Sequence, residues 1–240
     1  ISNMNFLLAN FVAIDGKGLH HTWKNNVARY PAFLDDYAFL IQALLLLQEI
    51  TTDTKWLFKA QSFTELVLEN FKEAETPFFY YTPEGQKDII VRKKEMYDGA
   101  IPSGNAIMAD NLYRLSILLD KNDWKERSLN MVSSLGKAII RYPTSFGNWA
   151  CLLQEITFGT NEIAVIGEGF SKIHQEILEK YIPHKIIMAA ATGEKALPIL
   201  SGKSAIRSTT IFLCRNYTCG NPVFSTNQLM SLIDKDKNSN

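Results

Sequence analysis

The fold class is decided by the segment Leu34-Asp35-Asp36-Tyr37-Ala38-Phe39-Leu40-Ile41-Gln42-Ala43-Leu44-Leu45-Leu46-Leu47-Gln48-Glu49-Ile50. Its apolar positions recur every three or four residues, which is the spacing of one broad buried helix face. A second segment with this spacing runs from Lys55 to Phe71, after the short polar link from Thr51 to Thr54. We therefore expect the two segments to form an antiparallel helical hairpin.

The same pattern occurs again further along the chain. Ser103 to Leu119 reads as a helix, Asp120 to Asp123 as a polar link, and Trp124 to Ile140 as a second helix. Aligning Trp56 with Trp124 also brings the inward apolar positions of the two hairpins into register. The sequence therefore contains an internal repeat of helical hairpins.

Two further segments belong to this helical region. Between the hairpins, Phe78 to Tyr81 and Ile89 to Arg92 flank a Pro83-Glu84-Gly85 turn, and we predict an inserted β-hairpin there. Ser145 to Phe158 is predicted to be the first helix of another hairpin.

After Gly159 the periodicity changes to that of a small α/β segment. Strands are expected at Glu162 to Ile166, Lys185 to Ala190 and Thr209 to Cys214, with helices at Ser171 to Tyr181 and Thr226 to Ile233. Strand, helix and strand in close succession imply at least one parallel pairing with a right-handed crossover.

Long apolar hairpins must bury their faces against neighbouring hairpins, and two and a half of them form an arc. We therefore predict a mainly α protein, a partial (α/α) toroid of helical hairpins with a small carboxy-terminal α/β segment. The expected divisions are residues 1–159 for the helical part, incomplete at its amino end, 160–234 for an α/β segment packed on it, and 235–240 for a flexible tail.

Composition excludes several classes of partner. Lysine and arginine number 25, as do aspartate and glutamate, so no basic field is available to hold nucleic acid. The longest apolar run, Ala43 to Leu47, is far shorter than the roughly 20 residues of a membrane helix. Three clustered cysteines are too few for a disulfide framework, which points to a reducing compartment and a cytoplasmic protein. We expect neither a metal nor a cofactor.

The first segment with chemical potential is His20-His21-Thr22-Trp23-Lys24-Asn25, predicted to be a loop before the first helix. His21, Trp23 and the carboxylates Asp35 and Asp36 could form one wall of a sugar-sized pocket, with Tyr37 beside them. In the alternative interpretation one aspartate caps the helix and the tryptophan is core.

The second segment is Lys94 to Asn105, which contains Tyr97-Asp98-Gly99-Ala100-Ile101-Pro102-Ser103-Gly104-Asn105. Glu95 and Asp98 could be the paired carboxylates of a glycoside hydrolase. Alternatively, Asp98 binds backbone amides of a structured loop and Ser103 caps the next helix.

The third segment is Cys214-Arg215-Asn216-Tyr217-Thr218-Cys219, at the end of a strand. Its spacing is not that of the two-residue thioredoxin motif, and a structural role is favoured over a redox role. Gly167-Glu168-Gly169 lacks the third glycine of a dinucleotide fingerprint and is interpreted as a tight turn.

These three segments, in this order, resemble the carboxy-terminal part of thioredoxin-domain-containing proteins related to spermatogenesis-associated protein 20. The resemblance covers nearly the whole chain, and the loop from Tyr97 to Asn105 is its most specific motif. It implies a toroid similar to those of six-hairpin glycosidases and N-acylglucosamine 2-epimerase. It also implies that a thioredoxin-like domain and the first toroid hairpins precede this part.

Two functions follow as hypotheses. In the first, the toroid binds or processes a small carbohydrate, as an epimerase or a glycosidase would. The catalytic candidates are Asp36, Asp98 and His21, and the substrate-binding candidates are Trp23, Asp35, Tyr37, Tyr97, Ser103 and Asn105. The epimerase version is weakened because no second histidine is placed to partner His21.

In the second hypothesis the chain is a non-catalytic interaction module for a thioredoxin-like domain, and the same side chains are bound to backbone groups instead. In either case we expect the exposed apolar helix faces of this piece to promote self-association.

Overall fold

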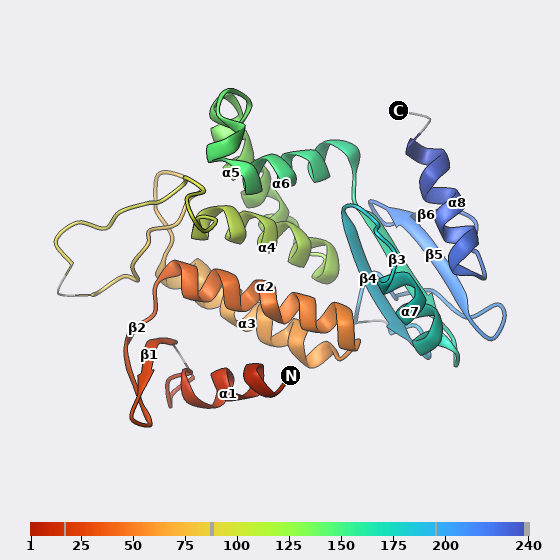
Figure 1. Ribbon diagram of the computed structural model, residues 1–240, viewed down its shortest axis with the longest axis horizontal. Coiled ribbons are helices and arrows are strands. Elements are labelled where there is room, and N and C mark those ends of the chain that lie inside the picture. Colours follow the sequence, from red (N-terminus) through yellow and green to blue (C-terminus); the bar gives the residue numbers. More distant parts are fainter. Residues whose placement is uncertain (17, 87–88, 195, 238–240) are drawn as a thin grey trace. The chain divides into compact units, whose positions relative to one another are not determined.

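The computed structural model of the chain describes residues 1–16, 18–86, 89–194 and 196–237. The chain divides into two compact units, whose elements are labelled in Figure 1. The helical unit comprises Ile1–Gln48, Asp53–Leu115 and Asn122–Leu153. The α/β unit comprises Glu49–Thr52, Ser116–Lys121 and the chain from Gln154 on.

The amino-terminal two thirds of the chain are mainly helical, which confirms the predicted fold class at that level. The elements are α1 (Ser2–Asn10), β1 (His20–Lys24), β2 (Val27–Pro31), α2 (Leu34–Thr51), α3 (Thr54–Asn70), α4 (Gly104–Leu119), α5 (Asn122–Arg141), the 3-10 turn η1 (Pro143–Ser145) and α6 (Gly147–Phe158).

The repeated helices pack through buried aromatic and polar contacts. The Tyr37 ring of α2 makes edge contacts with Phe63 and Phe71, with centroids 6.2 and 5.3 Å away. The side-chain amide of Asn111 on α4 donates to the carbonyl of Ala38 on α2 over 2.8 Å. Within the second hairpin, Ser128 Oγ on α5 donates to the carbonyl of Ala109 on α4 over 2.7 Å. These contacts join the two predicted hairpins into one layer of packed helices.

The segment from His20 to Lys24 was expected to be a loop, and that prediction is wrong. It is strand β1, paired antiparallel with β2 in a hairpin that places Lys24 opposite Val27. The turn residues Asn25 and Asn26 have φ values of 53° and 58°. Positive φ at both central residues matches the type I′ turn that connects tight hairpins, and asparagine tolerates this conformation.

The β-hairpin predicted between Phe78 and Arg92 is also not formed by the described residues, and residues 87–88 lie outside them. The N–H of Tyr81 does bond to the carbonyl of Lys93 over 2.7 Å. However, Nη2 of the Arg92 guanidinium donates hydrogen bonds to the carbonyls of Thr82 and Asn70, over 2.8 and 3.2 Å. The Arg92 side chain therefore bonds to the Thr82 carbonyl within the predicted hairpin and also to the last residue of α3.

The α/β unit follows the predicted order of elements. It contains β3 (Asn161–Ile166), α7 (Phe170–Leu178), β4 (Lys185–Ala190), β5 (Thr210–Arg215), β6 (Thr218–Cys219) and α8 (Thr226–Lys237). The sheet order is β4-β3-β5-β6, with β3 parallel to β4 and antiparallel to β5. The predicted parallel pairing is therefore confirmed, whereas strand β6 was not predicted.

One face of this sheet is covered by its two helices (Figure 1). Alternate residues of the three long strands, such as Ile163 and Val165, pack with Ile177 of α7 and Leu229 of α8. Gly167 ends β3 with φ 130°, and a Cβ there would lie 2.2 Å from the carbonyl oxygen of Ser208, so the predicted tight turn requires glycine.

The predicted flexible tail began at residue 235, but α8 continues through Lys237. Residues 238–240 of that tail lie outside the described residues.

Candidate functional site

A cavity of about 480 Å³ lies in the helical unit. One part of its wall is apolar and includes Leu7 and Phe11, whereas the other part is polar. The polar part contains His20, His21, Asp35, Asp36 and Tyr81. A concave, largely apolar site with a few convergent polar groups is the usual form of a small-molecule site, and its volume falls within the range of such sites.

His21 and Asp36 form a hydrogen-bonded pair at this cavity. Nδ1 of His21 donates to Oδ2 of Asp36 over 2.8 Å, and the side chains are 42% and 28% exposed. The same oxygen accepts the backbone N–H of Phe33, also over 2.8 Å. An acidic residue in the first turn that binds the N–H preceding the helix is one half of a capping box, so Asp36 both starts α2 and orients the imidazole.

Asp35, the adjacent residue, differs from Asp36 in its hydrogen bonding. Its Oδ1 is buried and has no hydrogen-bond partner among the described residues. Burial raises the pKa of Asp35 to about 6, the charges of Glu95 and Asp36 raise it as well, and a backbone hydrogen bond from Gly104 lowers it. A carboxyl with this pKa exchanges protons near neutral pH, which is the property required of a general acid or base.

Gly104 is essential to this arrangement. A Cβ at Gly104 would lie 2.3 Å from Oδ1 of Asp35, so the carboxylate would have to move. The first residue of α4 therefore leaves room for the carboxylate.

The cavity is negatively charged or neutral rather than positive. Among the described residues that line it, none is lysine or arginine, and two are aspartates. Tyr81 stacks on Phe33, with ring centroids 4.8 Å apart and an interplanar angle of 16°. Burial and the charges of Asp35 and Glu95 raise the pKa of Tyr81, so its hydroxyl stays protonated as a donor. Such a wall favours neutral or cationic ligands over anionic ones.

His20 also lines the cavity, although it is not among the site residues predicted from the sequence. Its Nδ1 is buried and has no hydrogen-bond partner among the described residues. Together with His21 it supplies two imidazoles at the same cavity. The adjacent pair His20-His21 before the acidic start of a helix was the sequence signal for a second histidine in the site. The pair does not predict this by itself, because successive side chains of a strand normally point to opposite faces.

Asp98 does not line this cavity. Its Oδ1 accepts the N–H of Ser103 over 3.0 Å, and its Oδ2 accepts the N–H of Asn148 over 2.8 Å. These amides stand at the beginnings of α4 and α6, so the carboxylate fixes two helix starts to one loop. The arrangement agrees with the structural interpretation of Asp98 given above.

Ser103 and Asn105 are likewise bound to the backbone. Ser103 Oγ accepts the N–H of Ala106 over 3.2 Å as a helix cap. The fully buried Asn105 accepts the N–H of Phe79 and donates to the carbonyls of Phe79 and Glu95, over 2.9 to 3.0 Å. These three hydrogen bonds of the Asn105 side chain are all with the main chain.

The three aromatic candidates also lie outside the cavity lining. The buried Tyr37 hydroxyl accepts the N–H of Leu19 over 2.8 Å. Trp23 packs against Phe6 and Phe11, and Tyr97 is 70% exposed. Of the nine predicted site residues, the cavity thus brings together His21, Asp35 and Asp36.

Neither a metal-binding cluster nor a membrane-spanning helix is present in the described part of the chain. Across residues 1–16, 18–86, 89–194 and 196–237, no three or more histidine, cysteine or acidic side chains are grouped to hold a metal ion. None of the helices in these ranges combines the length and hydropathy needed to cross a membrane.

Comparisons with known proteins show sequence similarity to several larger proteins. No family model matches the chain. It is 26% identical to spermatogenesis-associated protein 20 of Rattus norvegicus over 212 residues, which is 84% of this chain and 27% of that protein. The Mus musculus protein of the same name is 25% identical over the same shares, and a Caenorhabditis elegans protein named as uncharacterized is 24% identical over 85% of this chain and 29% of its own length. The chain thus spans a little over a quarter of these relatives, and over that part it is similar to spermatogenesis-associated protein 20.

Proposed function

We propose that the helical unit binds a small neutral carbohydrate in the cavity beside Asp35, and that Asp35 is the acid–base group of the site. The observation that carries the proposal is the Asp35 carboxyl itself. It is an unpartnered oxygen on a group with a pKa of about 6, at the polar end of an apolar cavity.

The similarity to spermatogenesis-associated protein 20 supports placing the chain in that family, as part of a larger protein with an (α/α) toroid and a preceding thioredoxin-like domain. The activity of such a whole protein is likewise a proposal. We also propose a cytoplasmic location for this protein.

The class of ligand follows from the shape and charge of the wall. A sugar presents C–H groups on one face and hydroxyls at its edge, which suits a cavity with one apolar side and one polar side. The absence of lysine and arginine from its described lining disfavours phosphorylated sugars.

Proton transfer fits this site better than glycoside hydrolysis. A glycosidase needs two carboxyl groups on opposite sides of the bond that it cleaves. Here Asp36 is committed to His21 and Phe33, and Asp98 to two backbone amides. That leaves Asp35 as one candidate acid–base group, and the imidazole of His20, which lines the same cavity, as a second. We therefore propose an isomerase or epimerase type of reaction.

The decisive experiment incubates the chain with neutral aldoses and ketoses in D₂O and measures deuterium at the carbon next to the carbonyl by mass spectrometry. Wild type is expected to incorporate deuterium and Asp35→Asn is not, while Glu69→Gln, a change of an exposed helical carboxylate, behaves like wild type. Deuterium incorporation that is equal in the Asp35→Asn variant would remove Asp35 from the mechanism.

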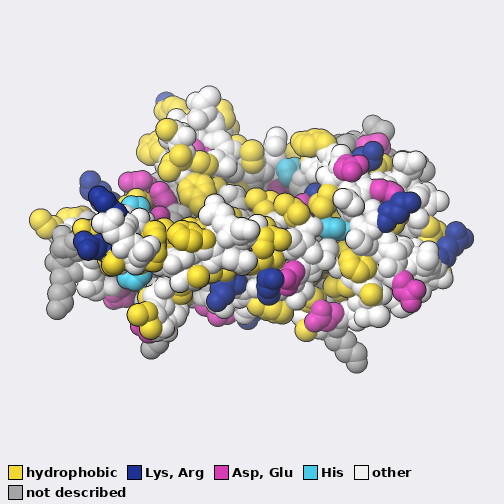
Figure 2. All heavy atoms as spheres, turned by 60° about the horizontal axis from the view of Figure 1, so that its bottom comes forward, with side chains coloured by type: hydrophobic (Ala, Val, Ile, Leu, Met, Phe, Trp, Pro, Cys, Tyr) yellow, Lys and Arg dark blue, Asp and Glu magenta, His cyan; other side chains and the backbone are white. Residues whose placement is uncertain are grey.

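A second candidate function is supported by a separate observation. Tyr37, Asp98, Ser103 and Asn105 all bond to main-chain groups, as expected of an interaction module. In the helical unit, hydrophobic side chains such as Ile1, Phe6 and Tyr30 are exposed, and Figure 2 shows hydrophobic groups on the face that carries α1 and the β1–β2 hairpin. Self-association through such groups is the expected result. Light scattering would detect it, and a strictly monomeric chain without ligand binding would contradict both candidates.

A further inference from the structure

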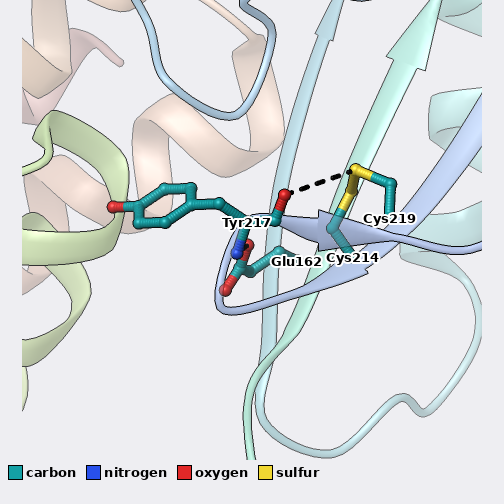
Figure 3. Close-up of a disulfide and its surroundings, with 4 residues drawn as sticks. All are labelled: Glu162, Cys214, Tyr217 and Cys219. Atoms are coloured by element: carbon teal, nitrogen blue, oxygen red, sulfur yellow. Dashed lines mark hydrogen bonds between the residues drawn. A yellow bond between two sulfur atoms is a disulfide. The ribbon is translucent and has the colours of Figure 1, made fainter.

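The α/β unit contains one disulfide, between Cys214 on β5 and Cys219 on β6 (Figure 3). The two residues are direct partners across the antiparallel pair, and the turn between them is Asn216-Tyr217. Cys214 is buried at 3% exposure, whereas Cys219 is exposed. The sulfur that an external reagent meets first is therefore that of Cys219.

Tyr217 lies inside this small loop, and both its backbone N–H and its hydroxyl donate hydrogen bonds to groups outside the loop. Its N–H donates to the buried carboxylate of Glu162 over 3.1 Å. Its hydroxyl has a single proton, which the carbonyls of Ser116 and Ile117 share, at 3.3 and 3.0 Å from the hydroxyl oxygen. Figure 3 shows the Tyr217 ring pointing away from the disulfide. We call Tyr217 with these contacts the tyrosine latch.

The carbonyls that the tyrosine latch binds belong to the last turn of α4. Asp120 follows that helix with φ 54°, and the N–H of Lys121 bonds back to the carbonyl of Ser116 over 3.1 Å. This is the Schellman arrangement, in which backbone N–H groups bond to the final carbonyls of the helix, and the Tyr217 hydroxyl adds a side-chain donor to those carbonyls. Burial and the charges of Asp120 and Glu162 raise the pKa of Tyr217, so its hydroxyl keeps its proton and remains a donor.

The backbone of the latch is held in an unfavourable conformation. Tyr217 has φ 59°, which is uncommon for a bulky residue and costs conformational energy. The strand ends on either side of this turn are paired through the backbone of β5 and β6. The disulfide adds a covalent restraint to this pairing, because it joins the two strands on either side of the turn.

We propose that Cys214–Cys219 is a thiol–disulfide exchange site for an external dithiol, and that its reduction releases the tyrosine latch from the end of α4. A thiolate of the dithiol attacks Sγ of Cys219, the S–S bond breaks, and Cys214 leaves as a thiolate that takes up a proton. The second thiol of the dithiol then displaces Cys219 as a thiol. The dithiol ends as a disulfide, and the chain has gained two electrons and two protons.

Reduction is expected to act locally rather than to unfold the protein. Cross-linking stabilises a fold mainly by closing a loop of the unfolded chain, and a loop between residues only five apart in sequence contributes little. The sheet core, which includes Ile163 and Ile211, does not depend on this bond. The change is therefore confined to the turn and to the helix end that it binds.

The first test is the accessibility of the disulfide in the folded chain. The purified chain is treated with dithiothreitol under native conditions, alkylated with iodoacetamide and analysed by mass spectrometry, with the exposed free Cys151 as internal standard. We expect alkylation of Cys151 alone before reduction, and of all three cysteines after it, with unchanged circular dichroism. Thiols at 214 and 219 in the untreated chain, or labelling only after unfolding, would overturn the proposal.

The second test measures the latch by hydrogen–deuterium exchange in peptides covering residues 116–121 and 214–219. Reduction, and separately the variant Cys214→Ser/Cys219→Ser, is expected to raise exchange in both segments by roughly tenfold or more, as for a segment that opens locally. Tyr217→Phe in the oxidised chain should raise exchange in 116–121 while the disulfide stays intact. Equal exchange in oxidised and reduced chains, or an unchanged 116–121 segment in Tyr217→Phe, would show that the disulfide holds no latch. Both tests are independent of any activity of the helical unit.

Discussion

Nδ1 of His21, on a β-strand, donates to Oδ2 of Asp36, in the first turn of α2, over 2.8 Å. The same carboxylate oxygen accepts the N–H of Phe33. The neighbouring Asp35 has no such partner for its buried Oδ1. Two consecutive aspartates therefore have different tasks, one holding the structure and one available for a proton.

The first prediction concerns Asp36. Replacing it by alanine removes the capping contact to Phe33 and releases His21, so the chain should lose about 1 kcal/mol of stability, mostly from the cap, because the partly exposed hydrogen bond to His21 contributes less. His21→Ala should cost less than Asp36→Ala. Urea unfolding at pH 7.5 measures both, and the reverse ranking would contradict the capping role.

The second prediction concerns Asp35 and pH. Because its folded pKa of about 6 lies above the ordinary value of 3.8, the folded state binds the proton more tightly than the unfolded state. This group favours folding fully below its unfolded pKa, and the contribution is lost as the pH rises through about 6. Asp35→Asn should therefore be more stable than wild type above that pH, by about 1 kcal/mol after allowing for solvent screening, and equal to it in acid. A constant stability difference from pH 4 to 8 by thermal unfolding would refute the assignment.

The third prediction uses two glycines that each begin a helix. Gly104→Ala would force the new methyl against Asp35, whereas nothing lies within 4 Å of a Cβ at Gly147. The first change should displace the carboxylate and abolish ligand binding, and Gly147→Ala should leave binding intact. Calorimetric titration with the sugar found by deuterium exchange distinguishes them, and equal affinity in both variants would argue against a site at Asp35.

The fourth prediction separates Asp98 from the site. Asp98→Ala leaves the N–H groups of Ser103 and Asn148 without their acceptor, so stability should fall by about 2 kcal/mol. At temperatures below its unfolding transition, the Asp98→Ala variant should bind the ligand with an affinity within about twofold of wild type. Loss of binding without loss of stability would restore Asp98 as a catalytic candidate.

The helices were predictable because their signal is local. In α2 and α3 the apolar spacing decides which face is buried, and residues such as Leu44, Leu57 and Val67 are completely buried. The order of the strands in the sheet was harder to predict, because β3 pairs with β5, which is distant from it in the sequence. The β1–β2 hairpin was missed although Asn25-Asn26 is a turn signal, since its strands lack a regular apolar alternation.

The site was predicted only in part, and the reason is physical. Asp35, Asp36 and Asp98 are the same residue type, and sequence shows none of their contacts. Whether a carboxylate accepts two backbone amides, as Asp98 does, or keeps a free buried oxygen, as Asp35 does, depends on Gly104 and on loops that meet only in the folded chain. His20 became a candidate only when its cavity was seen.

The central claim is that Asp35 is a proton-exchanging carboxyl in a ligand cavity, and its own titration tests this most directly. Carbon-13 NMR of the aspartate carboxyls, assigned with the Asp35→Asn variant, should give Asp35 a midpoint near pH 6, and that midpoint should move when a neutral monosaccharide is added. A midpoint near the ordinary value of 3.8 that is unchanged by any monosaccharide would contradict the account.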